Sequence, residues 1–164
     1  MNESYINSFS PIVGDEPKVL LLGTMPGKES LRLQEYYGNT RNAFWKIVFS
    51  HLNVVPVKDY EEKKKLIQLG KIAIWDVCYT AIRKTSLDAD IKNEKPNEIE
   101  AFLKLHPSIT TIGFNGKKAE KLYDKFFKRH DAIDYFTLLS TSPANARYTF
   151  EDKLNNWKTI FERL

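Results

Sequence analysis

Short apolar runs alternate with longer amphipathic segments along the chain, and this alternation predicts the secondary structure. Residues 19–22 are wholly apolar, which is typical of a strand that is buried on both faces of a sheet. Runs of this kind predict strands at residues 19–22, 71–77, 109–114 and 135–139. The segments between and after them predict helices at residues 43–52, 59–69, 97–105, 117–128 and 150–164.

The order of these elements indicates the class of fold. Strands that alternate with helices favour an α/β protein, a three-layer α/β/α sandwich with a central, mainly parallel, four-stranded sheet. Asn97 is expected to cap the helix that follows it, and Gly70 is expected to end the helix before it. The length of 164 residues is that of one domain, so we expect residues 1–164 to fold as a single unit.

The loops that follow the predicted strands carry most of the chemically suggestive residues. In a parallel sheet with right-handed crossovers these loops gather at the carboxyl edge, where α/β proteins bind ligands. The loops are residues 23–41, 76–87, 115–116 and 141–147. We therefore expect one site at that edge.

Composition narrows the class of protein. No apolar run approaches the roughly 18 residues of a membrane span, and we expect no signal peptide, because residues 1–6 lack its basic and apolar regions. Cys78 is the single cysteine, which excludes disulfides, cysteine-rich zinc sites and iron–sulfur clusters. We expect a cytoplasmic protein. Its net charge of +4 and pI near 9.0 are compatible with a nucleic-acid partner.

The loop after the first predicted strand combines glycine and proline, and it presents main-chain N–H groups at the carboxyl edge. It reads Gly23, Thr24, Met25, Pro26, Gly27. A phosphate-binding P-loop fits poorly, because Gly23 and Gly27 enclose three residues instead of four. Glu29 also separates Lys28 from Ser30. A plain strand-to-helix turn is the alternative interpretation.

The ten positions that start at Tyr36 combine aromatic and amide side chains, the groups that stack on a nucleobase and bind its edge. Tyr36 or Tyr37 is expected to stack on a ring, and Phe44 is a further candidate or a core residue. Asn39 or Asn42 is expected to hold a water molecule or to bind a base edge. A turn or helix-cap role is the alternative for both amides. Together these residues predict a pocket for a nucleobase.

Two further loops favour contact with a nucleic acid. Asn115 ends a predicted strand and is expected to face the base, and a basic helix follows it, which suits a phosphate. The loop at residues 140–147 is small and polar, so its hydroxyls and guanidinium could contact a DNA backbone. The expected DNA contacts are Gly116, Lys117, Lys118, Ser140, Thr141, Ser142, Pro143, Asn145 and Arg147. A solvated helix face and an ordinary surface loop are the alternatives.

Asp76 and Asp88 are the carboxylates nearest to the expected site, and they are the only acid–base candidates. For each of them a capping or salt-bridge role is the favoured interpretation. The three histidines are scattered, without the spacing of metal ligands, so we expect structural roles for them. No metal and no cofactor are expected.

Several of these segments resemble the uracil-DNA glycosylase superfamily, and most closely its hypoxanthine-DNA glycosylase branch. The similarity extends from Val19 to Trp157. It rests on Gly-Thr-Met-Pro-Gly at 23–27, Tyr-Tyr-Gly-Asn-Thr-Arg-Asn-Ala-Phe-Trp at 36–45, Trp-Asp-Val at 75–77, Ser-Leu-Asp at 86–88, Asn-Gly at 115–116 and Ser-Thr-Ser-Pro-Ala-Asn-Ala at 140–146. The resemblance implies a base excision repair enzyme, acting on double-stranded DNA, that flips out a deaminated base and hydrolyses its N-glycosidic bond. An Asn-bearing pocket without a well-placed lysine nucleophile predicts monofunctional hydrolysis. Hypoxanthine is the expected base, and we expect a monomer.

The chain departs from the superfamily pattern at positions that bear on the chemistry. Met25 stands where most branches place an Asp, Asn or Glu that positions water. The resemblance carries that role to Asn42, with Asn39 as the competing assignment. Asn145 stands where the best-known relatives use His to stabilise the leaving group.

Two functions from other classes stay open at this point. One is an α/β enzyme that acts on free nucleotides and uses the first loop for phosphate. The other is a module that binds damaged DNA without catalysis. A zinc base deaminase is poorly supported, because its His-x-Glu and paired-cysteine ligands are missing.

Overall fold

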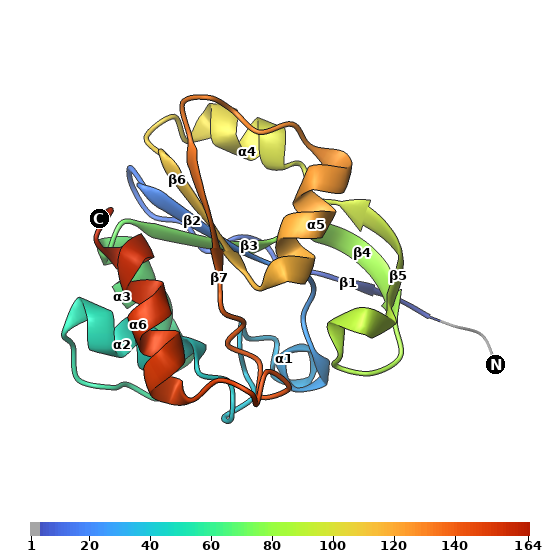
Figure 1. Cartoon of the computed structure of the whole chain (residues 1–164), viewed down its shortest axis with the longest axis horizontal. Coiled ribbons are helices and arrows are strands. Elements are labelled where there is room, and N and C mark those ends of the chain that lie inside the picture. The colour runs from blue at the N-terminus through green and yellow to red at the C-terminus, as the bar shows by residue number, and fades with distance from the viewer. Residues whose placement is uncertain (1–3) are drawn as a thin grey trace.

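A four-stranded parallel sheet forms the centre of the protein (Figure 1). The computed structural model describes residues 4–164. The strands lie in the order β3-β2-β6-β7, with the bounds β2 Val19–Gly23, β3 Ile72–Asp76, β6 Thr111–Asn115 and β7 Asp134–Leu138. Every pairing between neighbours in this sheet is parallel. The predicted fold class is confirmed, and the ends of each strand lie close to those predicted.

Helices cover both faces of this sheet (Figure 1). One layer consists of α2 (Phe44–Leu52), α3 (Tyr60–Leu69) and α6 (Phe150–Phe161), and the other of α4 (Ile99–Leu105) and α5 (Lys117–Phe126). Side chains of β2 alternate between the layers, since Leu21 packs with the first, and Leu20 and Leu22 pack with the second. Because both faces are covered, every residue of β2 and β6 is buried.

A second, antiparallel sheet lies beside the first, and the sequence pattern does not predict it. Its strands are β1 (Tyr5–Asn7), β4 (Cys78–Arg83) and β5 (Ile91–Pro96), in the order β1-β4-β5. The expectation that residues 76–87 form one loop is therefore wrong. Pairing partners such as Tyr5 and Ile82 are distant in the sequence, so the local pattern carries little sign of them. The short helix α1 (Lys28–Leu33) lies in the predicted loop at residues 23–41, and the 3-10 turn η1 (Asp88–Asp90) follows the predicted loop at residues 76–87.

The ends of two helices test the predicted caps. Gly70 ends α3, as predicted. Asn97 does not cap α4, because the helix begins after Glu98. The Asn97 amide instead donates to the main-chain oxygens of Asp76 at 2.8 Å and Cys78 at 3.0 Å. Asn97 therefore fixes the main chain where β3 passes into β4.

The carboxyl ends of the parallel strands meet at one edge of the sheet (Figure 1). Main-chain hydrogen bonds join neighbouring loops there. The Val77 N–H donates to the Gly23 oxygen at 2.8 Å, and the Gly116 N–H donates to the Leu138 oxygen at 3.0 Å. The loops after β2, β3, β6 and β7 therefore share one surface.

Two kinds of feature are absent from residues 4–164. None of their helices combines the length and the apolar character that a membrane span needs. No three of their His, Cys, Asp or Glu side chains are grouped as ligands for a metal ion.

Candidate active site

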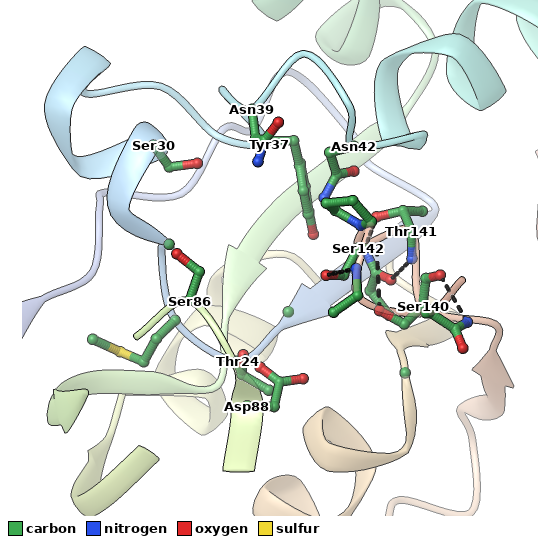
Figure 2. A pocket seen from close by; sticks show the side chains of 18 of the residues that line it. Thr24, Ser30, Tyr37, Asn39, Asn42, Ser86, Asp88, Ser140, Thr141 and Ser142 are labelled. Atoms are coloured by element: carbon green, nitrogen blue, oxygen red, sulfur yellow. Dashed lines mark hydrogen bonds between the residues drawn. The ribbon is translucent and has the colours of Figure 1, made fainter. Parts of the chain in front are cut away.

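A cleft of about 700 Å³ opens at the carboxyl edge of the parallel sheet (Figure 2). Its lining comes from stretches within residues 23–30, 36–42, 83–88, 115–117 and 137–148, together with Phe9 and Asp76. Loops that are distant in the sequence thus form one cavity, of a size that suits a small ligand. Among the described residues, both amides proposed to hold water and most of the proposed DNA contacts line it.

The loop after β2 approaches the cleft closely because Gly23 has no side chain. A Cβ at Gly23 would lie 2.6 Å from Asp76 Oδ1 and 3.2 Å from the Tyr37 hydroxyl. The loop is also hydrogen-bonded to the first residue of β4, since the Cys78 N–H donates to the Thr24 oxygen at 3.2 Å. The Thr24 hydroxyl donates to Asp88 Oδ1 at 2.8 Å. This loop is therefore rigidly held.

Arg83 of β4 supports the same loop, and the sequence gives no sign of this role. Its guanidinium donates to the Met25 oxygen at 2.8 Å, to the Ser86 oxygen, and to Asp88 Oδ1 at 3.3 Å. Burial lowers the pKa of Arg83, while the charge of Asp88 opposes the shift. Asp88 thus takes the salt-bridge role predicted for it.

Asp76, at the end of β3, differs from Asp88. Its side chain lines the cleft and is 4% exposed. Asp76 Oδ2 has no hydrogen-bond partner among the described residues. Burial raises the pKa of the Asp76 carboxyl to about 7, with the charge of Arg83 opposing the shift and that of Asp88 adding to it. The capping or salt-bridge role predicted for Asp76 is therefore wrong.

Tyr37 extends from the loop before α2 into the cleft (Figure 2). Its ring stacks on Phe44, with 3.9 Å between centroids and 20° between planes. The hydroxyl is buried close to the Asn115 amide, but it makes no hydrogen bond of good geometry with the described residues. Burial raises the pKa of Tyr37 well above its usual range, so the phenol stays protonated.

The other two aromatic candidates, Phe44 and Tyr36, have structural roles. Phe44 is fully buried behind Tyr37 and does not line the cleft, so the expectation that its ring contacts a base is wrong. Tyr36 lies at the cleft, yet its hydroxyl donates to the Ser10 oxygen at 2.9 Å. Its main-chain oxygen accepts from Trp45 Nε1 at 3.0 Å. Tyr37 is therefore the ring available for stacking.

Asn39 and Asn42 both line the cleft (Figure 2). Each side chain also accepts a hydrogen bond from a nearby main-chain N–H, which is the turn or helix-cap role given as the alternative to holding water. Asn42 Oδ1 accepts from the Phe44 N–H at 2.9 Å, at the start of α2. Asn39 Oδ1 accepts from the Arg41 N–H at 2.9 Å. The residue that follows Asn42 is hydrogen-bonded to the 140–147 loop, because the Ala43 N–H donates to the Thr141 oxygen at 3.0 Å. Asn42 is thus the amide beside the 140–147 loop.

Asn115 holds the 140–147 loop against the sheet. Its amide donates to Thr141 Oγ1 at 2.9 Å and accepts from the Thr141 N–H at 2.9 Å, and both residues are buried. Gly116, which follows, has φ +98°, a conformation that favours glycine. The Asn115 amide is therefore largely occupied, although the residue lines the cleft as predicted.

The 140–147 loop is stabilised from within and from behind. Asn145 Nδ2 donates to the Ser140 oxygen at 3.1 Å. Lys153 of α6, which is 6% exposed, donates to the Ser142 oxygen at 3.2 Å. The loop residues predicted to contact DNA, together with Gly116 and Lys117, all line the cleft, whereas Lys118 does not. The buried Lys153 is a support that the sequence pattern does not reveal.

Several known proteins are similar to this chain over nearly its whole length. Two proteins called hypoxanthine DNA glycosylase are similar, one from Methanosarcina acetivorans at 32% identity and one from Methanosarcina barkeri at 30%. The first alignment covers 93% of this chain and 96% of that protein, and the second covers 94% and 97%. A solution NMR structure from M. acetivorans, solved as a candidate uracil DNA glycosylase, has a TM-score of 0.81 at 30% identity. That comparison covers 96% of this chain and 97% of the other.

The sequence profile of one family matches nearly the whole chain. The match extends over residues 11–164, which include every segment that lines the cleft except Phe9. The chain therefore belongs to the uracil DNA glycosylase superfamily.

Proposed function

We propose that this protein is a DNA glycosylase that removes a deaminated base, hypoxanthine above all, and leaves an abasic site as the first step of base excision repair. The observation that carries the proposal is the amide of Asn42, held in place on the wall of a cleft large enough for an extruded base. The names of the two Methanosarcina relatives support the same activity and the same base.

Duplex DNA would lie across the mouth of the cleft. Exposed cations line that mouth, namely Lys28, Arg41, Lys117 and Arg147. Lysine and arginine side chains at these places would contact phosphates on either side of the damaged nucleotide. We propose that the protein binds double-stranded DNA as a monomer.

Extrusion of the nucleotide would place its base against Tyr37. Flipping costs a few kcal/mol, least for a mispaired base, which favours deaminated bases over normal ones. The Tyr37 side chain, held in place by its stacking on Phe44, would contact the extruded base.

Hydrolysis then depends on positioning. As the bond to the base lengthens, positive charge develops on the sugar, and a water molecule held by Asn42 Oδ1 would attack C1′. An amide is a weak base, so alignment and electrostatics must supply most of the rate. The N–H groups of the first loop and the amide of Asn145 would stabilise the departing base.

The reaction would be hydrolytic and monofunctional. The lysines that line the cleft, Lys28 and Lys117, are exposed, whereas the deep end of the cleft carries Asp76 and Tyr37. A Schiff-base mechanism needs a desolvated amine next to the sugar. The lining therefore favours water as the nucleophile.

The test uses labelled duplex oligomers that carry deoxyinosine, deoxyuridine, deoxyxanthosine or no damage, followed by alkaline cleavage. We expect excision from deoxyinosine, and a loss of about 100-fold or more in Asn42→Ala, since one positioned polar group is worth about that much. Binding to the same duplex, measured by gel shift, should survive.

Asn39→Ala is the matched control, because its amide also lines the cleft and also caps a turn. It should keep most of the excision rate. A loss confined to Asn39→Ala would transfer the water to that residue. A wild-type protein that releases no base from any oligomer would contradict the proposed function.

A further inference from the structure

Two polar groups that no described residue satisfies lie together at the deep end of the cleft. Asp76 Oδ2 and the Tyr37 hydroxyl are both buried, and neither has a hydrogen-bond partner among the described residues. The two side chains are neighbours, since the place where a Cβ of Gly23 would be lies 2.6 Å from Asp76 Oδ1, the other oxygen of the same carboxyl, and 3.2 Å from the Tyr37 hydroxyl. Buried polar groups are nearly always paired, so two unpaired ones at one place in a cleft indicate a ligand atom that completes them.

The surroundings of Asp76 favour the neutral acid. Arg83 is the facing cation, but its two terminal nitrogens already donate to Asp88 and to main-chain oxygens, and its Nε has no partner among the described residues. Asp88 adds a negative charge, and the nearby Cys78 thiol stays neutral because burial raises its pKa to about 12. Burial likewise raises the pKa of Asp76 to about 7 and keeps Tyr37 protonated. Below about pH 7 the site therefore offers two O–H donors.

Two convergent O–H donors suit an oxygen atom that gains negative charge. Resting on the proposed function, we infer that the neutral Asp76 carboxyl and the Tyr37 hydroxyl bind the carbonyl oxygen of the departing base, O6 in hypoxanthine. When the N-glycosidic bond breaks, its electron pair moves into the base, and part of that charge reaches this oxygen. The two hydrogen bonds strengthen as the charge develops, and no proton needs to transfer. Water supplies the oxygen that bonds to C1′ and releases one proton to solvent, and the departing base takes up one proton from solvent.

The same pair explains a preference for hypoxanthine over adenine, the base from which deamination forms it. Deamination replaces an exocyclic amino group with a carbonyl group. An amino group donates hydrogen bonds, so adenine would leave both buried O–H groups without an acceptor. Leaving buried groups unpaired is the strongest means by which a polar pocket rejects a wrong substrate.

The experiment measures single-turnover excision from deoxyinosine duplex, with enzyme in excess, between pH 5.5 and pH 8.5. The wild-type rate should fall by up to tenfold per pH unit above about pH 7, because the ionised Asp76 no longer donates and repels the anionic base. Asp76→Asn keeps a donor that does not titrate, so it should keep part of the activity and lose the alkaline fall. Asp76→Leu should lose about 100-fold or more, and Tyr37→Phe should lose at least about tenfold at every pH.

A control and an independent readout accompany these variants. Asp131→Asn changes an exposed carboxyl in the turn before β7, and it should match the wild type at every pH. Carboxyl carbon NMR of the free protein should give a titration midpoint near 7 for Asp76, a signal that Asp76→Asn removes. Thermal unfolding of each variant confirms that it is folded.

The outcomes separate this inference from the function on which it rests. A wild-type rate that rises through pH 7, or an Asp76→Asn variant with the wild-type alkaline fall, would overturn the inference while the glycosylase function stood. An NMR midpoint near 4 would overturn it as well. If the wild-type protein releases no base at any pH, the proposed function fails and the inference fails with it.

Discussion

At the scale of single residues, several buried polar groups at the cleft lack hydrogen-bond partners among the described residues, whereas buried polar groups in proteins are nearly always paired. Asp76 Oδ2, the Tyr37 hydroxyl and Arg83 Nε are buried and lack hydrogen-bond partners among the described residues. All three belong to residues that line the cleft. An unpaired buried group costs about 1–3 kcal/mol. We infer that local stability is lower here because the groups are arranged for a ligand.

The pH dependence of stability follows from Asp76. Its folded pKa of about 7 lies above the unfolded value, near 3.9, so the folded state holds the extra proton between these limits. Its contribution to stability is therefore lost as pH rises from about 4 to about 7. Asp76→Asn removes the buried charge, so it should be more stable than the wild type at pH 8, with a smaller gain at pH 5. Urea unfolding at both pH values measures this.

The contradictory result would be a gain that is the same at pH 5 and pH 8, or a loss at pH 8. Either would mean that Asp76 is ionised in the folded protein throughout this range. Asp131→Asn, at an exposed site, should show no such pH-dependent difference.

At the scale of elements, helix α6 positions the 140–147 loop, which we propose to contact DNA. Trp157 Nε1 donates to the Leu139 oxygen at 2.8 Å, just before the loop. Lys153 Nζ donates to the Ser142 oxygen at 3.2 Å inside it. Burial lowers the pKa of Lys153, which reflects the cost of placing its ammonium behind the loop. The helix therefore sets where the loop lies, although its own side chains stay out of the cleft.

Lys153→Met tests this support. Methionine keeps the apolar stem and the volume, but it removes the bond to Ser142. We expect stability to change by less than about 1.5 kcal/mol, and DNA affinity to fall by about three- to tenfold because the loop is less ordered. Fluorescence anisotropy gives the affinity, and amide hydrogen exchange over residues 140–147 should become faster.

Lys158→Met is the control on the same helix, because Lys158 is exposed and its ammonium forms an ion pair with Glu162 at 3.9 Å. It should change neither the affinity nor the exchange of the loop. Equal effects of the two substitutions would assign the loss to general charge and not to loop support.

At the scale of the whole molecule, the net charge of +4 is modest, and the position of the positive side chains matters more for DNA binding than their number. Exposed cations from four separate segments line the mouth of the cleft, at Lys28, Arg41, Lys117 and Arg147. Such an arrangement attracts a polyanion to the cleft more strongly than the net charge alone would indicate.

DNA affinity should therefore fall steeply with salt. For Lys117→Gln and Arg147→Gln we expect weaker binding of all duplexes, and a salt slope reduced by about one for each lost phosphate contact. Titrations by fluorescence anisotropy between about 50 and 200 mM salt give the slopes. Lys128→Gln, beyond the far end of α5, should keep the wild-type slope, and a reduction there would argue against a localised DNA surface.

The apolar pattern alone was enough to predict the sheet and its site edge. The run at residues 19–22 is buried on both faces in the structure, and such a strand needs no information beyond its own composition. Parallel connection then brings the strand ends together, so the sequence also predicts which loops share a surface. The superfamily motifs lie in those loops, which is why the family could be predicted as well.

Only the tertiary structure decided which side chains are free to act. Asp76 and Asp88 are the same residue type near the same edge, yet Arg83 pairs with Asp88, and Asp76 Oδ2 has no partner within residues 4–164. That difference depends on β4, whose pairing with a distant segment has no local signature. In the sequence Tyr37 and Phe44 are equally plausible as rings that contact a base. In the structure they stack on each other, and Phe44 is buried behind Tyr37. Burial and pairing depend on contacts between distant segments, and for this reason a pattern along the chain predicts where a site lies better than which atoms carry its chemistry.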